Sequence, residues 1–137
     1  MAENVIVELT REQAQAVMNA TELLARLHIG QFREITEEFG DRFVTDDKKF
    51  DSARRDHAND LLEQACRTIF GVNQYGWPDI GEKDETQERC WAVYAMIRYA
   101  LAWNDHPEGH PWSVAFNEPL GYGEPLPKCE VQDDDKN

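Results

Sequence analysis

The stretch from Asp84 to Trp103 constrains the fold of this chain more than any other segment. Its apolar residues cover more than half of a helical circumference; they are Cys90, Trp91, Val93, Tyr94, Met96, Ile97, Ala100, Leu101 and Trp103. A surface helix has one apolar stripe, whereas a helix that is apolar on most sides is covered by other parts of its protein. We therefore expect a central apolar helix over about 84–103, with the other helices packed around it.

Three other segments show the three- and four-residue spacing of apolar residues that predicts helices: 14–27, 31–39 and 51–70. The first follows a capping-box pattern, in which Thr10 caps the helix and Gln13 reaches back. The third is expected to begin at a cap formed by Asp51 or Ser52 and to stop at Gly71. The loop from Val72 to Gly81 holds Gly, Pro, Asn and two aromatic residues, which indicates a structured loop.

Short strands are predicted at both ends of the chain. Asn4 to Leu9 alternates in the way typical of a strand. Trp112–Asn117 can form a second strand, and Lys128–Val131 could pair with the N-terminal one. The predicted fold is thus α+β and mainly α, with three to four helices and a small antiparallel sheet. We expect a single domain over 1–131 and a charged, flexible tail over 132–137.

The net charge of −13 argues against two kinds of partner. Duplex DNA and anionic membranes are bound by basic surfaces, so we expect no direct nucleic acid and no membrane as partner. The acidic residues are dispersed and interleaved with Lys and Arg. A mimic of the nucleic-acid backbone needs a regular acidic face, so the pattern favours a solvated surface over mimicry.

No apolar run approaches the roughly 20 residues that span a bilayer. The N-terminus also lacks the basic patch and apolar stretch of a secretory signal. We therefore expect a cytoplasmic protein. Cys66, Cys90 and Cys129 are far apart and form no C-x-x-C pair, so they are expected to be reduced structural thiols, with neither a metal nor another cofactor.

Recognisable catalytic motifs are missing. The chain has no Gly-rich phosphate loop, no G-x-S-x-G and no H-E-x-x-H. We therefore expect a binding protein rather than an enzyme.

Arg98 is the most informative charged residue, because it lies within the apolar helix. A buried Arg must be paired, either with an acidic residue or with a bound anion. An anion clamp would combine it with Arg89 and with Arg54 and His57 of the preceding helix, since the guanidinium fork suits phosphate.

Aromatic residues in or beside loops could complete such a site by stacking on a nucleobase, or could instead close the ends of a small core. They are Tyr75, Trp77, Trp103, Trp112 and Tyr122. His106 and His110 flank a bend with two acidic residues. They favour a hydrogen-bonded turn over a metal site, because Pro107 and Pro111 break the helix that would align them. The candidate ligand-binding residues are Arg54, His57, Arg89, Arg98, Trp103, His106, His110 and Trp112.

Scattered blocks over most of the chain resemble a group of small bacteriophage and prophage proteins of uncharacterised function. The blocks are ELTREQA (8–14), LLARLHIGQFREI (23–35), MIRYALAW (96–103), PEG (107–109), FNEP (116–119) and PLPK (125–128). The resemblance implies a phage origin and brings no functional residues with it. Small acidic non-structural phage proteins are often inhibitors of host enzymes or of host antiviral systems.

Three functions follow as hypotheses. The first is a phage accessory protein in the host cytoplasm that antagonises a host defence or enzyme by sequestering a small, anionic, nucleotide-like ligand. The second is an acidic inhibitor that docks on a host protein, such as one that binds nucleic acid. The third is a structural phage protein that forms homo-oligomers, with the apolar excess of 84–103 in the interface.

Overall fold

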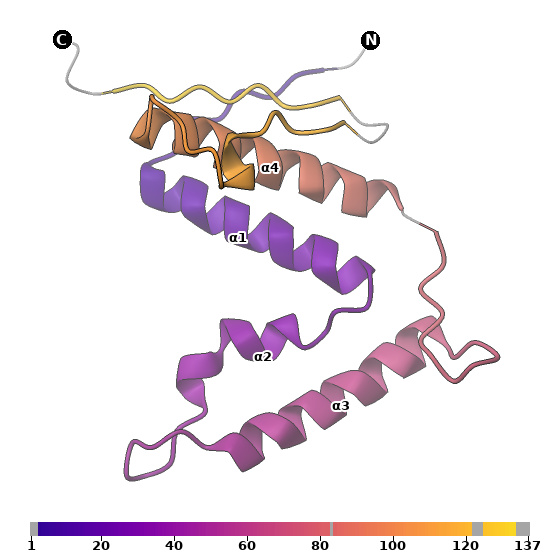
Figure 1. The fold of residues 1–137 in the computed structure, drawn as a ribbon. Helices are drawn as coiled ribbons and strands as arrows, with labels where there is room; N and C mark the ends of the chain where they lie inside the picture. The colour runs from indigo at the N-terminus through magenta and orange to yellow at the C-terminus, as the bar shows by residue number, and fades with distance from the viewer. Residues whose placement is uncertain (1–2, 83, 122–124, 134–137) are drawn as a thin grey trace. The chain divides into compact units, whose positions relative to one another are not determined.

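The computed structural model describes residues 3–82, 84–121 and 125–133. Over those ranges the chain is mainly helical, as the sequence predicts (Figure 1). The helices are α1 (Arg11–His28), α2 (Glu34–Glu38), α3 (Ser52–Phe70) and α4 (Glu85–Asp105), with short 3₁₀ turns η1 (Gly40–Arg42) and η2 (Val114–Phe116).

Side-chain caps determine where the long helices begin. Thr10 Oγ1 accepts the Gln13 N–H at 3.1 Å, and Gln13 Oε1 accepts the Thr10 N–H at 3.0 Å, which confirms the capping box. Asp51 accepts the Arg54 N–H at 3.1 Å and is the cap of α3. Asp84 accepts the Gln87 N–H at 2.7 Å at the start of α4. Each cap satisfies a backbone donor that the first helical turn leaves free.

The predicted antiparallel sheet is wrong. The described residues form no sheet, and their only β-type pairings are two isolated bridges, Val44 with Phe50 and Val72 with Pro78. A strand is stable only when its backbone groups find partners on a neighbouring strand. The C-terminal third offers few, because prolines, which lack an N–H, recur through it at 119, 125 and 127.

The three expected strands each take another form. Asn4–Leu9 is neither helix nor strand, and Lys128–Val131 is not paired with it. Within Trp112–Asn117 the chain forms η2, because the Ser113 side chain caps the turn by accepting the Ala115 N–H at 3.4 Å. This local hydrogen bond competes directly with an extended conformation.

The chain divides into two compact units. Unit 1 comprises residues 1–22 and 88–137, and unit 2 comprises residues 23–87, so the boundary crosses α1 and α4. Each unit is described by itself below. The single domain over 1–131 and the central position of α4 among all the helices stay predictions. Of the expected tail, residues 134–137 lie outside the described ranges.

In unit 1 the first turns of α1 lie beside the last turns of α4, and the two helices run antiparallel (Figure 1). An ion pair between Arg11 and Asp105 joins these ends. The segment after α4 folds back on it, because the Trp103 ring packs edge-on against Phe116 at 5.1 Å between centroids and its Nε1–H donates to Phe116 O at 3.2 Å.

In unit 2 the end of α3 packs against the residues that follow α1. Phe32 meets Phe70 edge-on at 6.0 Å, and Cys66 Sγ–H donates to Gly30 O at 3.5 Å. Gly30 has φ +79, and a Cβ there would lie 2.5 Å from Ile80 Cδ1, so the position needs glycine. Burial raises the pKa of the Cys66 thiol, which keeps it protonated.

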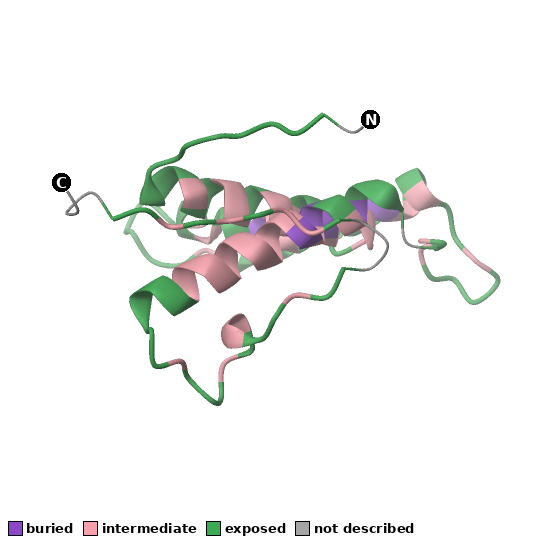
Figure 2. Ribbon diagram, turned by 90° about the horizontal axis from the view of Figure 1, so that it is seen from above, coloured by how far each residue is buried: buried purple, intermediate pink, exposed green. Residues whose placement is uncertain are grey.

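Both units bury mainly small side chains. The buried apolar residues are Ala25, Cys66, Cys90 and Ala92, and no large side chain among the described residues is fully buried. In Figure 2, α4 is mostly at intermediate burial, whereas α1 has both exposed and intermediate residues. Many large apolar side chains therefore face solvent, and their locations become the first guide to a binding surface.

Candidate functional site

The aromatic loop, which we define as residues 71–79, is held by hydrogen bonds between its own backbone groups. It begins where α3 ends, at Gly71 with φ +76. Asn73 N–H donates to Trp77 O at 2.8 Å, Gly76 N–H donates to Asn73 O at 3.0 Å, and Asp79 N–H donates to Gly71 O at 3.0 Å. These bonds close the loop on itself.

The Asn73 side chain fixes the tip of the aromatic loop. Its Oδ1 accepts the backbone N–H groups of Tyr75 at 2.9 Å and of Trp77 at 3.1 Å. Asn is suited to this position because its short side chain can replace a backbone acceptor within a turn. Gly76 supplies the positive φ, +81, that the turn requires.

A side chain of α3 ties the aromatic loop to the helix. Arg67 Nη1–H donates to Gly76 O at 2.9 Å. The same guanidinium pairs with Glu63 one helical turn away, at 3.4 Å. The Arg67 side chain thus links α3 to the tip of the loop.

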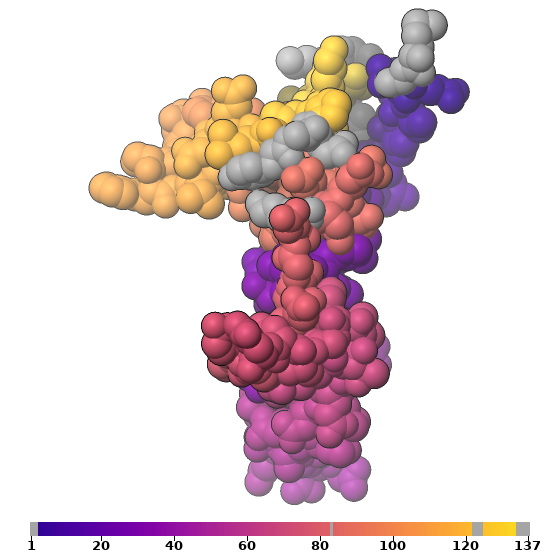
Figure 3. Space-filling model, turned by 90° about the vertical axis from the view of Figure 1, so that its right-hand side faces the viewer, coloured from indigo at the N-terminus to yellow at the C-terminus, as the bar shows by residue number. Residues whose placement is uncertain are grey.

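The large side chains of the aromatic loop are exposed to solvent. Tyr75 is 76% exposed and Trp77 is 64% exposed, and Ile69 and Val72 beside them are also more than half exposed. In Figure 3 the residues around 75, in rose, stand out from the surface of unit 2. The exposed side chains are thus two aromatic residues and Val72 in the loop and Ile69 near the end of α3. This composition is typical of a protein-binding surface.

The sequence predicts this loop, but none of its residues is among the candidate ligand-binding residues. It predicts a structured loop over 72–81, which the hydrogen bonds confirm, and it counts Tyr75 and Trp77 among the loop aromatics. The signal that marks the site is the spacing of Asn73 and Gly76 around Tyr75, because that spacing builds a closed turn with an aromatic side chain at its tip.

The eight predicted ligand-binding residues divide between the two units. Arg54 and His57 lie on α3 in unit 2, where both are exposed. Arg54 donates to Val44 O at 3.4 Å and lies 5.9 Å from the centre of the Phe43 ring. The other six belong to unit 1, where Arg89 is exposed near the start of α4.

Arg98 is half-buried on α4 and is held by an aromatic residue. Its Nη1–H donates to Tyr94 OH at 3.3 Å, and its guanidinium carbon lies 5.0 Å from the centre of the Tyr94 ring. Its Nε is buried without a hydrogen-bond partner within the described ranges. Tyr94, rather than a carboxylate, is therefore the main contact that the structure gives this cation.

Three predicted residues of unit 1 come together around Phe116. The rings of Trp103, His106 and His110 lie 5.1, 6.4 and 6.5 Å from the Phe116 ring. Gly109 permits this packing, because a Cβ there would lie 2.9 Å from the Trp103 ring. The cluster lies at the bend after α4, where the Gly109 N–H donates to His106 O at 2.8 Å.

The remaining predictions concern two loop aromatic residues, Trp112 and Tyr122, and a metal site at His106. The backbone N–H of Trp112 donates to His110 Nδ1 at 3.3 Å, and the residue is 88% exposed. Tyr122 lies outside the described residues. His106 Nδ1 lies 3.7 Å from Glu108 Oε1, and in the part of the chain that the structure describes no three His, Cys, Asp or Glu residues gather as a metal site would need.

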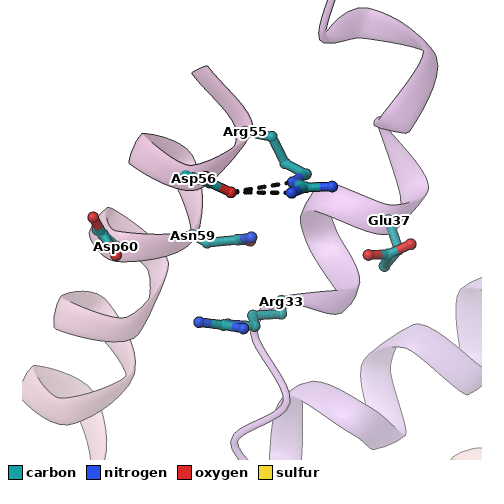
Figure 4. A pocket seen from close by; sticks show the side chains of 6 residues that line it. All are labelled: Arg33, Glu37, Arg55, Asp56, Asn59 and Asp60. Atoms are coloured by element: carbon teal, nitrogen blue, oxygen red, sulfur yellow. Dashed lines mark hydrogen bonds and ion pairs between the residues drawn. The ribbon is translucent and has the colours of Figure 1, made fainter. Parts of the chain in front are cut away.

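An open cleft of about 440 Å³ lies between α2 and α3 in unit 2; it is lined by Arg33, Glu37, Arg55, Asp56, Asn59 and Asp60. Figure 4 shows Arg33 and Asn59 pointing toward one another across it, and Arg55 bonded to Asp56. The lining residues include two Arg and three acidic residues, so the lining has no excess of positive charge. It does not have the electrostatics of an anion site.

Comparison of the chain with protein-family models, curated proteins and solved structures finds no match. The phage resemblance therefore stays a prediction. In the described ranges no helix is long and apolar enough to cross a membrane.

Proposed function

We propose that this chain is a binding protein that docks on a partner protein through the aromatic loop, without catalysing a reaction. The observation that carries the proposal is the pair of hydrogen bonds that the Tyr75 and Trp77 backbone N–H groups donate to Asn73 Oδ1, which fixes the backbone of two exposed aromatic residues. Tyr and Trp are the residues most often found at the energetic centres of protein interfaces.

Pre-organisation is the physical reason why this loop suits binding. Association has to offset the entropy lost when flexible side chains and loops become ordered. The backbone of the aromatic loop is already bonded to itself and to Arg67. Tyr and Trp also have only two side-chain torsions each, so burying them gives much contact area for little lost freedom.

The charge of the chain indicates the kind of partner. At −13, its field favours approach to a basic surface and disfavours other acidic proteins. The partner chemistry that fits is thus an apolar pocket for Tyr75 and Trp77 with a basic surround. If the phage resemblance is correct, such a partner belongs to the host cytoplasm and is inhibited by the docking.

The geometry favours docking over sequestration of a nucleotide-like ligand. Of the predicted ligand-binding residues, Trp103, His106 and His110 meet around Phe116, where they close a turn. The cleft of unit 2 has two guanidinium groups against three carboxylates. A pocket for phosphate needs cations in excess of anions.

Affinity capture with matched variants tests the proposal. The full chain is immobilised, and proteins that it retains from host lysate are compared with those retained by Tyr75→Ala/Trp77→Ala. Trp112→Ala is the control, because that indole is exposed to a similar degree but lies in unit 1. We expect the double variant to lose a partner that Trp112→Ala keeps. Equal retention by both variants, or no retained protein with the wild type, would overturn the proposal.

A further inference from the structure

The aromatic loop has a structural counterpart at the other end of α3. We call this counterpart, residues 43–51, the charged loop, because its tip over 46–49 reads DDKK. The charged loop leads into α3 at Asp51, whereas the aromatic loop leaves the helix at Gly71. Figure 1 shows the two loops at opposite ends of α3, the charged loop in violet and the aromatic loop in rose. Both belong to unit 2.

Three backbone hydrogen bonds close the charged loop. Thr45 N–H donates to Lys49 O at 2.7 Å, Lys48 N–H donates to Thr45 O at 2.8 Å, and Asp51 N–H donates to Phe43 O at 2.8 Å. In the aromatic loop the same three bonds join the residues at the corresponding places, which are 73 with 77, 76 with 73, and 79 with 71. The isolated β-bridge of each loop also lies at the matching place. The two loops therefore have one backbone framework, in which residue 45 corresponds to residue 73 and residue 51 to residue 79.

The features that fix the tip of each loop correspond as well. Thr45 Oγ1 accepts the backbone N–H of the fourth residue after it at 3.2 Å, and Asn73 Oδ1 accepts the equivalent N–H at 3.1 Å. Lys48 has φ +59 and Gly76, at the matching place, has φ +81. Among the described residues Lys48 is the only one other than glycine with positive φ. The framework thus imposes this conformation even on a residue type that disfavours it.

The two loops differ in the side chains at their tips. Asp47 and Lys49 of the charged loop hold the places that Tyr75 and Trp77 hold in the aromatic loop. All four residues are exposed. Because the same backbone forms with charged side chains at these places, the folding of the loop does not require Tyr75 or Trp77. Large apolar side chains that are exposed without a role in folding indicate contact with another molecule.

We propose that residues 74–77 determine the specificity of the docking surface, and that the loop beneath them is a framework on which this specificity can be moved. The inference rests on the proposed function, since it concerns the partner that the aromatic loop binds. A partner with an apolar pocket then binds whichever loop carries the aromatic tip. Part of the apolar surround is already present at the charged loop, because Val44 and Val72 lie at matching places and are 43% and 51% exposed.

Exchange of the tips tests the shared framework. One variant replaces NQYGW at 73–77 by TDDKK, and a second replaces TDDKK at 45–49 by NQYGW. Each exchange trades two acidic and two basic residues for none or the reverse, so the net charge of the loops as a pair can be kept constant by combining them. We expect both variants to fold, with the Asp51 and Asp79 amides still protected in NMR hydrogen exchange. Loss of protection at the exchanged loop would overturn the inference, because the framework would then depend on its tip.

Binding of the captured partner tests the transfer of specificity. The probe is the protein that the wild type retains and Tyr75→Ala/Trp77→Ala loses. In that double-variant background, NQYGW at 45–49 should restore binding to within about tenfold of the wild-type affinity. The matched control carries NQAGA at 45–49 and should restore nothing.

The outcomes separate this inference from the proposed function. If the NQYGW variant is folded and does not bind, or if the NQAGA control binds as well, the specificity does not lie in the tip and the inference is wrong, while the docking surface stands. If the wild type retains no protein, or if Tyr75→Ala/Trp77→Ala retains it equally, the proposed function is wrong and the inference fails with it.

Discussion

Asn73 and Trp77 are joined twice, because the Asn73 N–H donates to Trp77 O at 2.8 Å and Asn73 Oδ1 accepts the Trp77 N–H at 3.1 Å. The two bonds fix the chain on both sides of the exposed Tyr75 side chain. The conformation of the loop tip, which the proposed docking surface requires, therefore depends in part on the Asn73 side chain.

Replacement of Asn73 tests that dependence. Asn73→Ala leaves the Tyr75 and Trp77 amides without their acceptor, at a cost of about 1 kcal/mol per hydrogen bond. We expect both amides to lose most of their protection in NMR hydrogen exchange, and partner affinity to fall by about tenfold with both aromatic residues in place. Asn73→Asp keeps the acceptor oxygen and should behave as the wild type does. Unchanged protection in Asn73→Ala would show that other contacts hold the loop.

Thr36 and Asn59 form a side-chain bond between α2 and α3. Thr36 is buried, at 3% exposure, and its hydroxyl lies 2.6 Å from Asn59 Oδ1. Thr36→Val should lower the free energy of unfolding by about 1–3 kcal/mol, because it leaves the half-buried Asn59 amide without its partner. In urea titrations, Thr36→Val/Asn59→Leu should cost less than the sum of the single changes. Strict additivity would show that the two residues act independently.

Alanine substitutions at Gly30 and Gly81 distinguish the cost of backbone strain from the cost of a steric clash. Both have positive φ, +79 and +72, but only Gly30 has a side chain, Ile80, within reach of an added Cβ. Gly81→Ala should cost about 1 kcal/mol from backbone strain alone, and Gly30→Ala should cost more. Ile80→Val removes the atom that would lie 2.5 Å from the new Cβ. It should therefore restore part of the stability of Gly30→Ala and none of that of Gly81→Ala, as measured by urea unfolding.

Asp84 should make the free energy of unfolding depend on pH. Its pKa lies below its usual value, chiefly because the Gln87 N–H donates to it and secondly because of the 2.6 Å hydrogen bond with the His28 ring. A carboxyl with a lowered folded-state pKa contributes stability above its unfolded value and loses it as the pH falls through the folded one.

The urea midpoint of the wild type should thus drop as the pH falls below about 5 and through the lowered pKa of Asp84, and that of Asp84→Asn should drop less. Asn retains the capping oxygen, so this variant still forms α4. If the urea midpoints of the two proteins fall in parallel as the pH is lowered, other carboxyl groups cause the loss of stability in acid.

The helices could be predicted from the sequence because their signals are local. The Thr10–Gln13 capping box, the Asp51 cap and the stop at Gly71 all lie within a few residues of the bonds that they form. The sequence predicted a sheet wrongly, because a strand needs a distant partner and local patterns do not show whether one is present. Nothing in Asn4–Leu9 indicates whether Lys128–Val131 will supply one.

The candidate site was only partly predictable for a related reason. Sequence patterns identify Tyr75 and Trp77 as loop aromatics, but exposure depends on what the rest of the chain covers. Trp103 has the same sequence signal and instead packs against Phe116. Because Arg98 lies in an apolar helix, the sequence predicts that it pairs with an anion. In the structure its guanidinium instead contacts the Tyr94 ring one turn away.

Calorimetric titration of the captured partner with Trp77→Ala tests the central claim most directly. Truncation of an aromatic residue at the centre of an interface typically costs 2 kcal/mol or more, so we expect the dissociation constant to rise at least about tenfold. Trp112→Ala should leave it within about twofold, and circular dichroism should show both variants folded. A Trp77→Ala variant that is folded and binds as the wild type does would contradict the assignment of the aromatic loop as the docking surface.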